Sequence, residues 1–179
     1  MVKTKWKNNN VLKEKSVDIP EELKENINKL LKENQIHEIL EDAQTVSNRY
    51  RNNDGKGKRL LTKESEAVSY AISRMPATYV AVSSVLEQTL NNYNEELTSV
   101  IDVGAGTGAV VWAVNDVATC NAIKCLEREE SMINIGKKLM ENTDLNDVKW
   151  EEFDILQDEI QEKADLVITS YMINELPFM

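Results

Sequence analysis

The stretch Ile101–Val110, IDVGAGTGAV, decides the fold because an apolar run enters a glycine-rich turn that leads into a helix. Gly104, Gly106 and Gly108 have no Cβ atom, so the backbone can turn sharply and approach a ligand closely. The first amides of the following helix can bind that ligand. The turn alone leaves a dinucleotide possible as the ligand, because Ala109 also completes a GxGxxA pattern.

Three carboxylates around the turn favour S-adenosylmethionine over a dinucleotide. Asp102 precedes the turn, where an acid can accept from the cofactor ammonium or order the loop, whereas a dinucleotide brings an anionic pyrophosphate. Glu127 lies 23 residues after Gly104 and can accept from two ribose hydroxyls. Asp154 follows the third strand and can accept from the adenine amino group. The predicted cofactor-binding set is Asp102, Gly104, Ala105, Gly106, Gly108, Glu127, Asp154 and Ser170.

Each acid also has a purely structural interpretation. Asp102 can be a loop-ordering group only, Glu127 a favourable charge at a helix N-terminus, and Asp154 an ordinary cap. The joint position of all three at the carboxyl ends of neighbouring strands favours the cofactor interpretation, because ligands bind in that crevice in open α/β sheets.

The residues around the turn alternate between short β-rich runs and helical runs. Such alternation predicts right-handed crossovers and a parallel sheet covered by helices on both faces. The fold class is therefore α/β, with an incomplete Rossmann-like methyltransferase sheet of strand order 3-2-1-4 over residues 97–179. The expected strands are 99–103, 122–126, 148–153 and 165–170, and the expected helices are 108–117, 131–142 and a short one over 157–163.

An all-helical segment over residues 16–92 precedes the sheet. Apolar residues at mostly helical spacing predict a helix from Pro20 to Tyr50, with a possible break near Asn34. A second helix begins at Thr62 and stops or kinks at Pro76, and a third runs from Ala77 to about residue 91. Residues 1–15 are lysine-rich without apolar periodicity, which predicts a flexible basic arm.

Charge is distributed unevenly over the 179 residues, whose formal net charge is −10. Residues 49–63 hold six basic side chains and one acid, whereas residues 127–179 hold 14 acids and five bases. The basic segment is either a solvated loop or a contact to an RNA phosphate backbone, and Arg74 faces the cofactor pocket or RNA, or forms a surface ion pair. The RNA or substrate set is Arg49, Arg51, Lys58, Arg59 and Arg74.

Other site types have little support in the composition. Cys120 and Cys125 are the only two cysteines, which is too few for a disulfide framework, and they lack the second pair of a zinc site, so no metal is expected. No apolar run approaches roughly 18 residues and the N-terminus lacks a secretion signal, so we expect no membrane partner and a cytoplasmic location.

The methyl acceptor would lie near the end of the fourth strand. Tyr171 and Asn174 follow that strand, and the Asn174 amide can orient an acceptor by hydrogen bonding, although both residues can also simply shape the loop. Glu175 and Leu176 stand where amino-group methyltransferases have prolines in their Asn-Pro-Pro-aromatic signature. The acceptor atom therefore stays open.

Two sets of residues carry a family resemblance. IDVGAGTGAV and the segment ADLVITSYMINELP at 164–177 resemble the seven-strand S-adenosylmethionine-dependent methyltransferase superfamily. RLLTKESEAVSYAISRMPATYVAV at 59–82, with the preceding NRYR and the terminal NELP, resembles the methyltransferase-like family associated with the mitochondrial small ribosomal subunit and its bacterial relatives. The resemblance covers most of the chain after about residue 45.

That resemblance implies a methyltransferase acting on rRNA or on the small ribosomal subunit, with S-adenosylmethionine as cofactor. A non-catalytic ribosome-assembly or RNA-binding factor with the same fold is the alternative, and a small-molecule methyltransferase is a weaker one. Members of the family often carry an iron–sulfur cysteine cluster in their C-terminal half, which is not expected in a chain that ends at Met179. We expect a fragment or a truncated relative whose exposed fourth strand could support a dimer.

Overall fold

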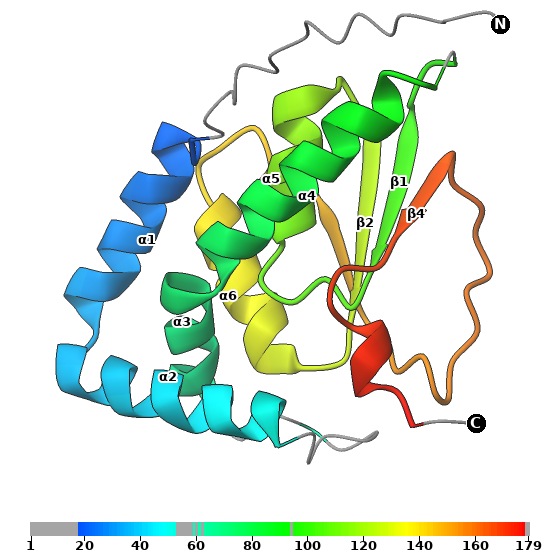
Figure 1. Ribbon diagram of the computed structural model, residues 1–179. Coiled ribbons are helices and arrows are strands. Elements are labelled where there is room, and N and C mark those ends of the chain that lie inside the picture. The colour runs from blue at the N-terminus through cyan, green and yellow to red at the C-terminus, as the bar shows by residue number, and fades with distance from the viewer. Residues whose placement is uncertain (1–17, 53–58, 60, 62, 94, 178–179) are drawn as a thin grey trace, which may run out of the picture.

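The computed structural model describes residues 18–52, 59, 61, 63–93 and 95–177. The arm predicted over residues 1–15 and the predicted RNA contact Lys58 lie outside the described residues. Six helices and a four-stranded sheet make up the described part, and Figure 1 shows the helices gathered on one side of the strands. Among the described residues, no helix is long and apolar enough to cross a membrane.

Four helices form the N-terminal segment, as the sequence predicts. The expected break near Asn34 is confirmed, because Asn34 is extended between the first two helices. Asn26 on the first helix donates from Nδ2 to the Leu139 carbonyl at 2.8 Å, which ties this segment to the helices of the sheet. The N-terminal helices are α1 (Glu21–Glu33), α2 (Ile36–Arg51), α3 (Glu64–Ser73) and α4 (Met75–Leu90), with Pro76 in the first turn of α4.

The sheet is parallel with strand order β3-β2-β1-β4, which confirms the prediction. The central strand β1 pairs with β2 on one side and with β4 on the other, so the glycine turn leaves from the middle of the sheet. The strands are β1 (Ser99–Val103), β2 (Ala122–Glu127), β3 (Lys149–Glu152) and β4 (Leu166–Ile168), and a short 3-10 helix η1 (Ile173–Glu175) follows.

One large apolar core joins the N-terminal helices to the sheet. Helix α5 (Ala109–Val117) packs against α4, and α6 (Glu130–Met140) packs against α1, α3, β2 and β3. The fully buried side chains of Trp112, Tyr79 and Leu23 belong to the same cluster, although they come from both segments. The helical segment and the sheet therefore bury each other and share one core.

The sequence predicted helices on both faces of the sheet, and this prediction is wrong for the described residues. Ile101, Val103, Leu126 and Phe153 form a second, smaller cluster on the opposite face, packed with Ala164 and Met172 and not with a helix. The expected helix over 157–163 is absent from the described structure, because that segment holds one apolar residue, Ile160, and has no stripe to bury.

The edge strand β4 leaves apolar side chains in solvent, as the sequence predicts. Val167 is 55% exposed, Tyr171 64% and Ile173 67%, whereas Leu166 and Ile168 are half-buried against the main core. Association of two chains through this edge stays a prediction.

Helix α6 approaches β3 at a glycine. A Cβ atom added to Gly136 would lie 2.6 Å from Cζ2 of Trp150, whose ring packs against the main core. Real Cβ atoms do not come this close to a rigid ring, so the glycine sets the distance between the helix and the strand.

We expect Gly136→Ala to destabilise the fold. Ala in a helix interior usually stabilises relative to Gly by about 0.5–1 kcal/mol, so the steric effect has to reverse that sign. Overpacking of this kind costs about 1–3 kcal/mol, which a urea unfolding curve measures. Asn134 is an exposed residue of the same helix, two positions before Gly136. The control variant Asn134→Ala should not destabilise the fold. A Gly136→Ala variant as stable as the wild type would contradict the close approach.

Candidate cofactor and acceptor site

The glycine turn is fixed to the end of the neighbouring strand. The amides of Gly104 and Ala105 donate to the Leu126 carbonyl at 2.8 and 3.2 Å. Gly106 and Gly108 have φ angles of +56° and +86°, a left-handed backbone conformation that residues with a Cβ atom rarely adopt. The turn therefore needs glycine, and helix α5 begins directly after it.

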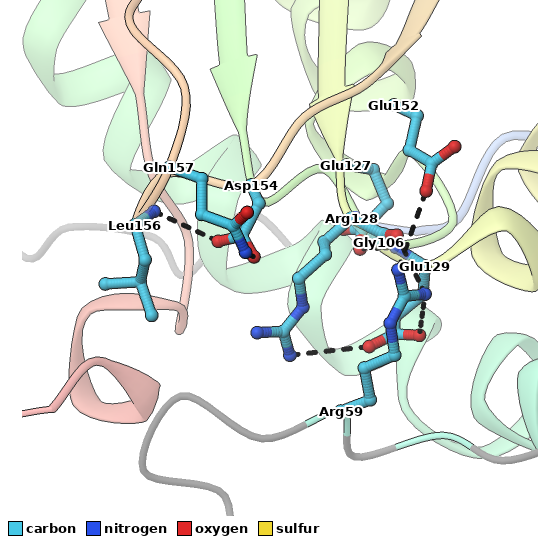
Figure 2. A network of polar contacts seen from close by, with 9 residues as sticks. All are labelled: Arg59, Gly106, Glu127, Arg128, Glu129, Glu152, Asp154, Leu156 and Gln157. Atoms are coloured by element: carbon cyan, nitrogen blue, oxygen red, sulfur yellow. Dashed lines mark hydrogen bonds and ion pairs between the residues drawn. The ribbon is translucent and has the colours of Figure 1, made fainter.

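The carboxylate of Glu127 is the polar centre of this arrangement. Its Oε2 accepts from the Gly106 amide at 2.7 Å and its Oε1 from the Glu129 amide at 2.8 Å. Burial raises the pKa of this carboxyl above its usual value, although the two amides oppose that shift. Only 8% of the surface of this residue is exposed. Figure 2 shows Glu127 beside Gly106 and Glu129, and its predicted contact with ribose hydroxyls stays a prediction.

A cavity of about 590 Å³ opens where the four strands end. Among the predicted cofactor residues, Gly104, Gly106, Glu127, Asp154 and Ser170 line it. A Cβ atom at Gly106 would meet only Cε1 of Tyr70, at 3.9 Å, so the turn faces open space. An adenosyl ligand fits this combination of volume, carboxylates and exposed turn backbone. Ala105 and Gly108 are buried and shape the turn from outside the lining.

Asp154 lies at the cavity and also caps a turn. Its carboxylate accepts from the Leu156 amide at 3.0 Å and from Nε2 of Gln157 at 3.0 Å, as Figure 2 shows. Its own amide donates to Asp158 at 2.7 Å. The two interpretations of Asp154 are thus compatible, because a carboxylate has lone pairs left after accepting these bonds.

Asp102 does not line the cavity. It lies on the same sheet face as Val100, under the helices, with none of its surface exposed, and neither carboxylate oxygen has a hydrogen-bond partner among the described residues. Burial, followed by the charge of Glu127, raises the pKa of Asp102 to about 8. The contact between Asp102 and a cofactor ammonium that the sequence suggested stays a prediction. The Asp102 side chain itself lies under the turn.

The basic residues separate into two groups. Arg49 forms a 2.8 Å ion pair with the buried Glu66, and Arg59 pairs with Glu129 at 3.2 Å. Figure 2 shows Arg59 close to Arg128, whose carbonyl accepts from it at 3.3 Å. Arg51 and Arg74 instead line the cavity, Arg51 at the end of α2 and Arg74 between α3 and α4.

The two residues predicted to face the methyl acceptor follow β4. Tyr171 lines the cavity and has a left-handed φ of +60°, and Asn174 belongs to η1, although the description does not extend to its side chain. The cavity lining also includes residues outside the predicted site set, among them Tyr50, Tyr70 and Glu175. Glu175 was identifiable, since it follows β4 at the same sheet edge as Tyr171. Tyr50 and Tyr70 were not, because they reach the cavity only through the packing of α2 and α3.

Asp102 should make stability depend on pH. A carboxyl whose folded pKa is about 8 and unfolded pKa about 3.9 favours the folded state at low pH, and this contribution is lost as the pH rises toward 8. Asp102→Asn removes that titration. Urea unfolding between pH 5 and 8 should show the variant gaining on the wild type by roughly 1 kcal/mol per pH unit. A difference that stays constant with pH would contradict the buried carboxyl.

Three solved proteins align with part of this chain. A candidate S-adenosyl-L-methionine-dependent methyltransferase from Methanococcus maripaludis aligns over 61% of this chain and 51% of its own, at 22% identity and a TM-score of 0.50. A candidate RNA methyltransferase from Pyrococcus horikoshii aligns over 58% and 49%, at 18% identity and 0.45. The S-adenosylmethionine-bound aminopentose methyltransferase CalS10 from Micromonospora echinaspora aligns over 52% and 37%, at 15% and 0.43.

The first of these similarities shows a methyltransferase fold, and this chain spans about half or less of each solved protein. No curated protein matches the sequence. Residues 64–177 match the family described as mitochondrial small ribosomal subunit Rsm22, and this match covers well over half of the chain. With its glycine turn, parallel sheet and preceding helices in the order that the sequence predicted, the chain belongs to the Rsm22 family.

Proposed function

We propose that this chain binds S-adenosylmethionine and belongs to a methyltransferase acting on rRNA or on the small ribosomal subunit. The observation that carries the proposal is the cavity at the ends of the strands, which brings the Gly106 backbone, Glu127 and Asp154 to one ligand-sized space. The family described by its small-subunit association supports the choice of partner.

Each residue has a distinct task in this proposal. Glu127 accepts hydrogen bonds from ribose hydroxyls while it holds the turn, Asp154 accepts from the adenine amino group, and the Gly106 backbone contacts the ligand directly. When bound, the cofactor supplies an activated methyl group for an in-line displacement. Because such a displacement needs no compulsory general base, the remaining task of the chain is to hold an acceptor beside Tyr171, at the end of β4.

Gly106→Arg should weaken cofactor binding. The new side chain would enter the cavity beside Tyr70, and the left-handed backbone would be strained. Calorimetry with S-adenosylmethionine should show an affinity loss of about tenfold or more. Asn142→Arg is the matched control, because Asn142 is exposed, has a φ of +62° and lies outside the cavity.

Equal affinity of the Gly106→Arg variant and the wild type would place the ligand elsewhere. A wild-type chain that binds small-subunit rRNA and no S-adenosylmethionine would favour the non-catalytic assembly factor.

RNA binding should depend on Arg51 more than on Arg59. Among the described residues, Arg51 lies within ion-pair distance of no carboxylate, whereas Arg59 pairs with Glu129 and Glu152. In a salt series with small-subunit rRNA, Arg51→Gln should lower affinity and reduce the slope of log K against log salt by about one. Arg59→Gln should change the slope less, and the reverse order would contradict this assignment.

A further inference from the structure

One end of the cavity is built by the N-terminal helices and not by the sheet. Tyr50 comes from α2, Tyr70 from α3 and Arg74 from the junction of α3 and α4. The two tyrosine rings lie 6.2 Å apart between centroids, tilted by 38°. Glu175 of η1 also lines the cavity. The contacts proposed for the adenosyl group use none of these four side chains.

Arg74 and Glu175 carry opposite charges at this end. Both side chains line the cavity together with Tyr50 and Tyr70. Burial raises the pKa of each tyrosine, Glu175 raises it further, and Arg74 lowers it. Arg74 donates from Nη2 to Ser47 Oγ at 2.9 Å. Among the described residues, no ion pair joins Arg74 to Glu175, and no hydrogen bond engages the Glu175 carboxylate.

A guanidinium and a carboxylate that face one cavity without pairing fit a ligand with both charges. An anionic phosphate would meet repulsion from Glu175 and Glu127, and a simple cation would leave Arg74 without a counter-charge. The tyrosine rings restrict access of water to this end, which strengthens charge-assisted hydrogen bonds there. A zwitterion offers each of the two side chains a group of opposite charge.

We propose that Arg74 and Glu175 bind the zwitterionic amino-acid end of the adenosyl cofactor. Arg74 donates to the ligand carboxylate, and the ligand ammonium donates to Glu175. This inference rests on the proposed function, and it assigns to Glu175 the ammonium contact that the sequence pattern suggested for Asp102. Asp102 lies under the turn, outside the cavity lining, whereas Glu175 lies in it.

The ionisation of Glu175 adds a second property that can be measured. Burial, the charge of Glu127 and that of Glu129 raise its pKa to about 7, against the opposing charge of Arg128. The groups that face it are thus Glu127 on β2, Arg128 and Glu129 after β2, Tyr50 on α2 and Tyr70 on α3. Because an ammonium pairs with the ionised carboxylate, the amino-acid end should bind more tightly at pH 8 than at pH 6.

Two nucleosides isolate this end of the ligand. S-adenosylhomocysteine carries the amino-acid group without a sulfonium, and 5′-methylthioadenosine lacks the amino-acid group. In calorimetry, the wild type should bind the first more tightly than the second. Arg74→Gln and Glu175→Gln should each lower the affinity for S-adenosylhomocysteine by roughly tenfold to a hundredfold. Both variants should leave the affinity for 5′-methylthioadenosine unchanged. The pH dependence of the ratio of the two affinities should disappear in Glu175→Gln.

Charge-matched controls come from exposed residues outside the cavity. Lys32→Gln and Glu159→Gln remove the same charges and should change neither affinity. Thermal unfolding without ligand monitors the fold of every variant. Where a neutral variant is less stable, Arg74→Lys or Glu175→Asp keeps the charge and should retain most of the preference for S-adenosylhomocysteine.

The outcomes separate the inference from the proposed function. The assignment of Arg74 and Glu175 would be overturned by neutral variants that lower the affinity for both nucleosides equally, or for neither. It would also be overturned if the charge-keeping variants bound both nucleosides as the neutral variants do. A wild-type chain that binds neither nucleoside would overturn the proposed function, and this inference with it.

Discussion

The carboxylate of Glu127 accepts hydrogen bonds from two backbone amides, one in the glycine turn after β1 and one directly after β2. These bonds fix the turn of one strand against the end of its neighbour, and the Gly104 and Ala105 amides add bonds to the β2 backbone. Because the carboxylate is nearly buried, these two amides are its main compensation for lost water. The floor of the cavity depends on this contact.

The N-terminal helices complete the site and also stabilise the sheet. They cover one face, share a single core with α5 and α6, and supply Tyr50, Tyr70 and Arg74 to the cavity. The opposite face carries only a small cluster among the described residues, without a helix over it. The site therefore belongs to the junction of two segments, and a sheet without its preceding helices would lack one wall.

The periodicity of the sequence predicted the order of elements well, because apolar alternation and glycine punctuation are local signals. β1 at Ser99–Val103 and the break at Asn34 follow from them directly. The pairing of Arg49 with Glu66 and of Arg59 with Glu129 could not be predicted, since these partners are 17 and 70 residues apart. The sequence therefore suggested that the basic segment is free to bind RNA, whereas in its described part Arg49 and Arg59 form ion pairs with acids of the same chain. The burial of Asp102 under the turn was equally hidden, because its motif fits a loop-facing acid as well.

The central claim is that the turn held by Glu127 is where the cofactor binds. Amide NMR of the ¹⁵N-labelled chain during a titration with S-adenosylmethionine tests it most directly. We expect saturable shifts of the Gly106 and Glu129 amides, because ribose hydroxyls would share the carboxylate that both amides donate to. Unchanged Gly106 and Glu129 signals at saturating ligand, or shifts confined to residues away from the cavity, would contradict the claim.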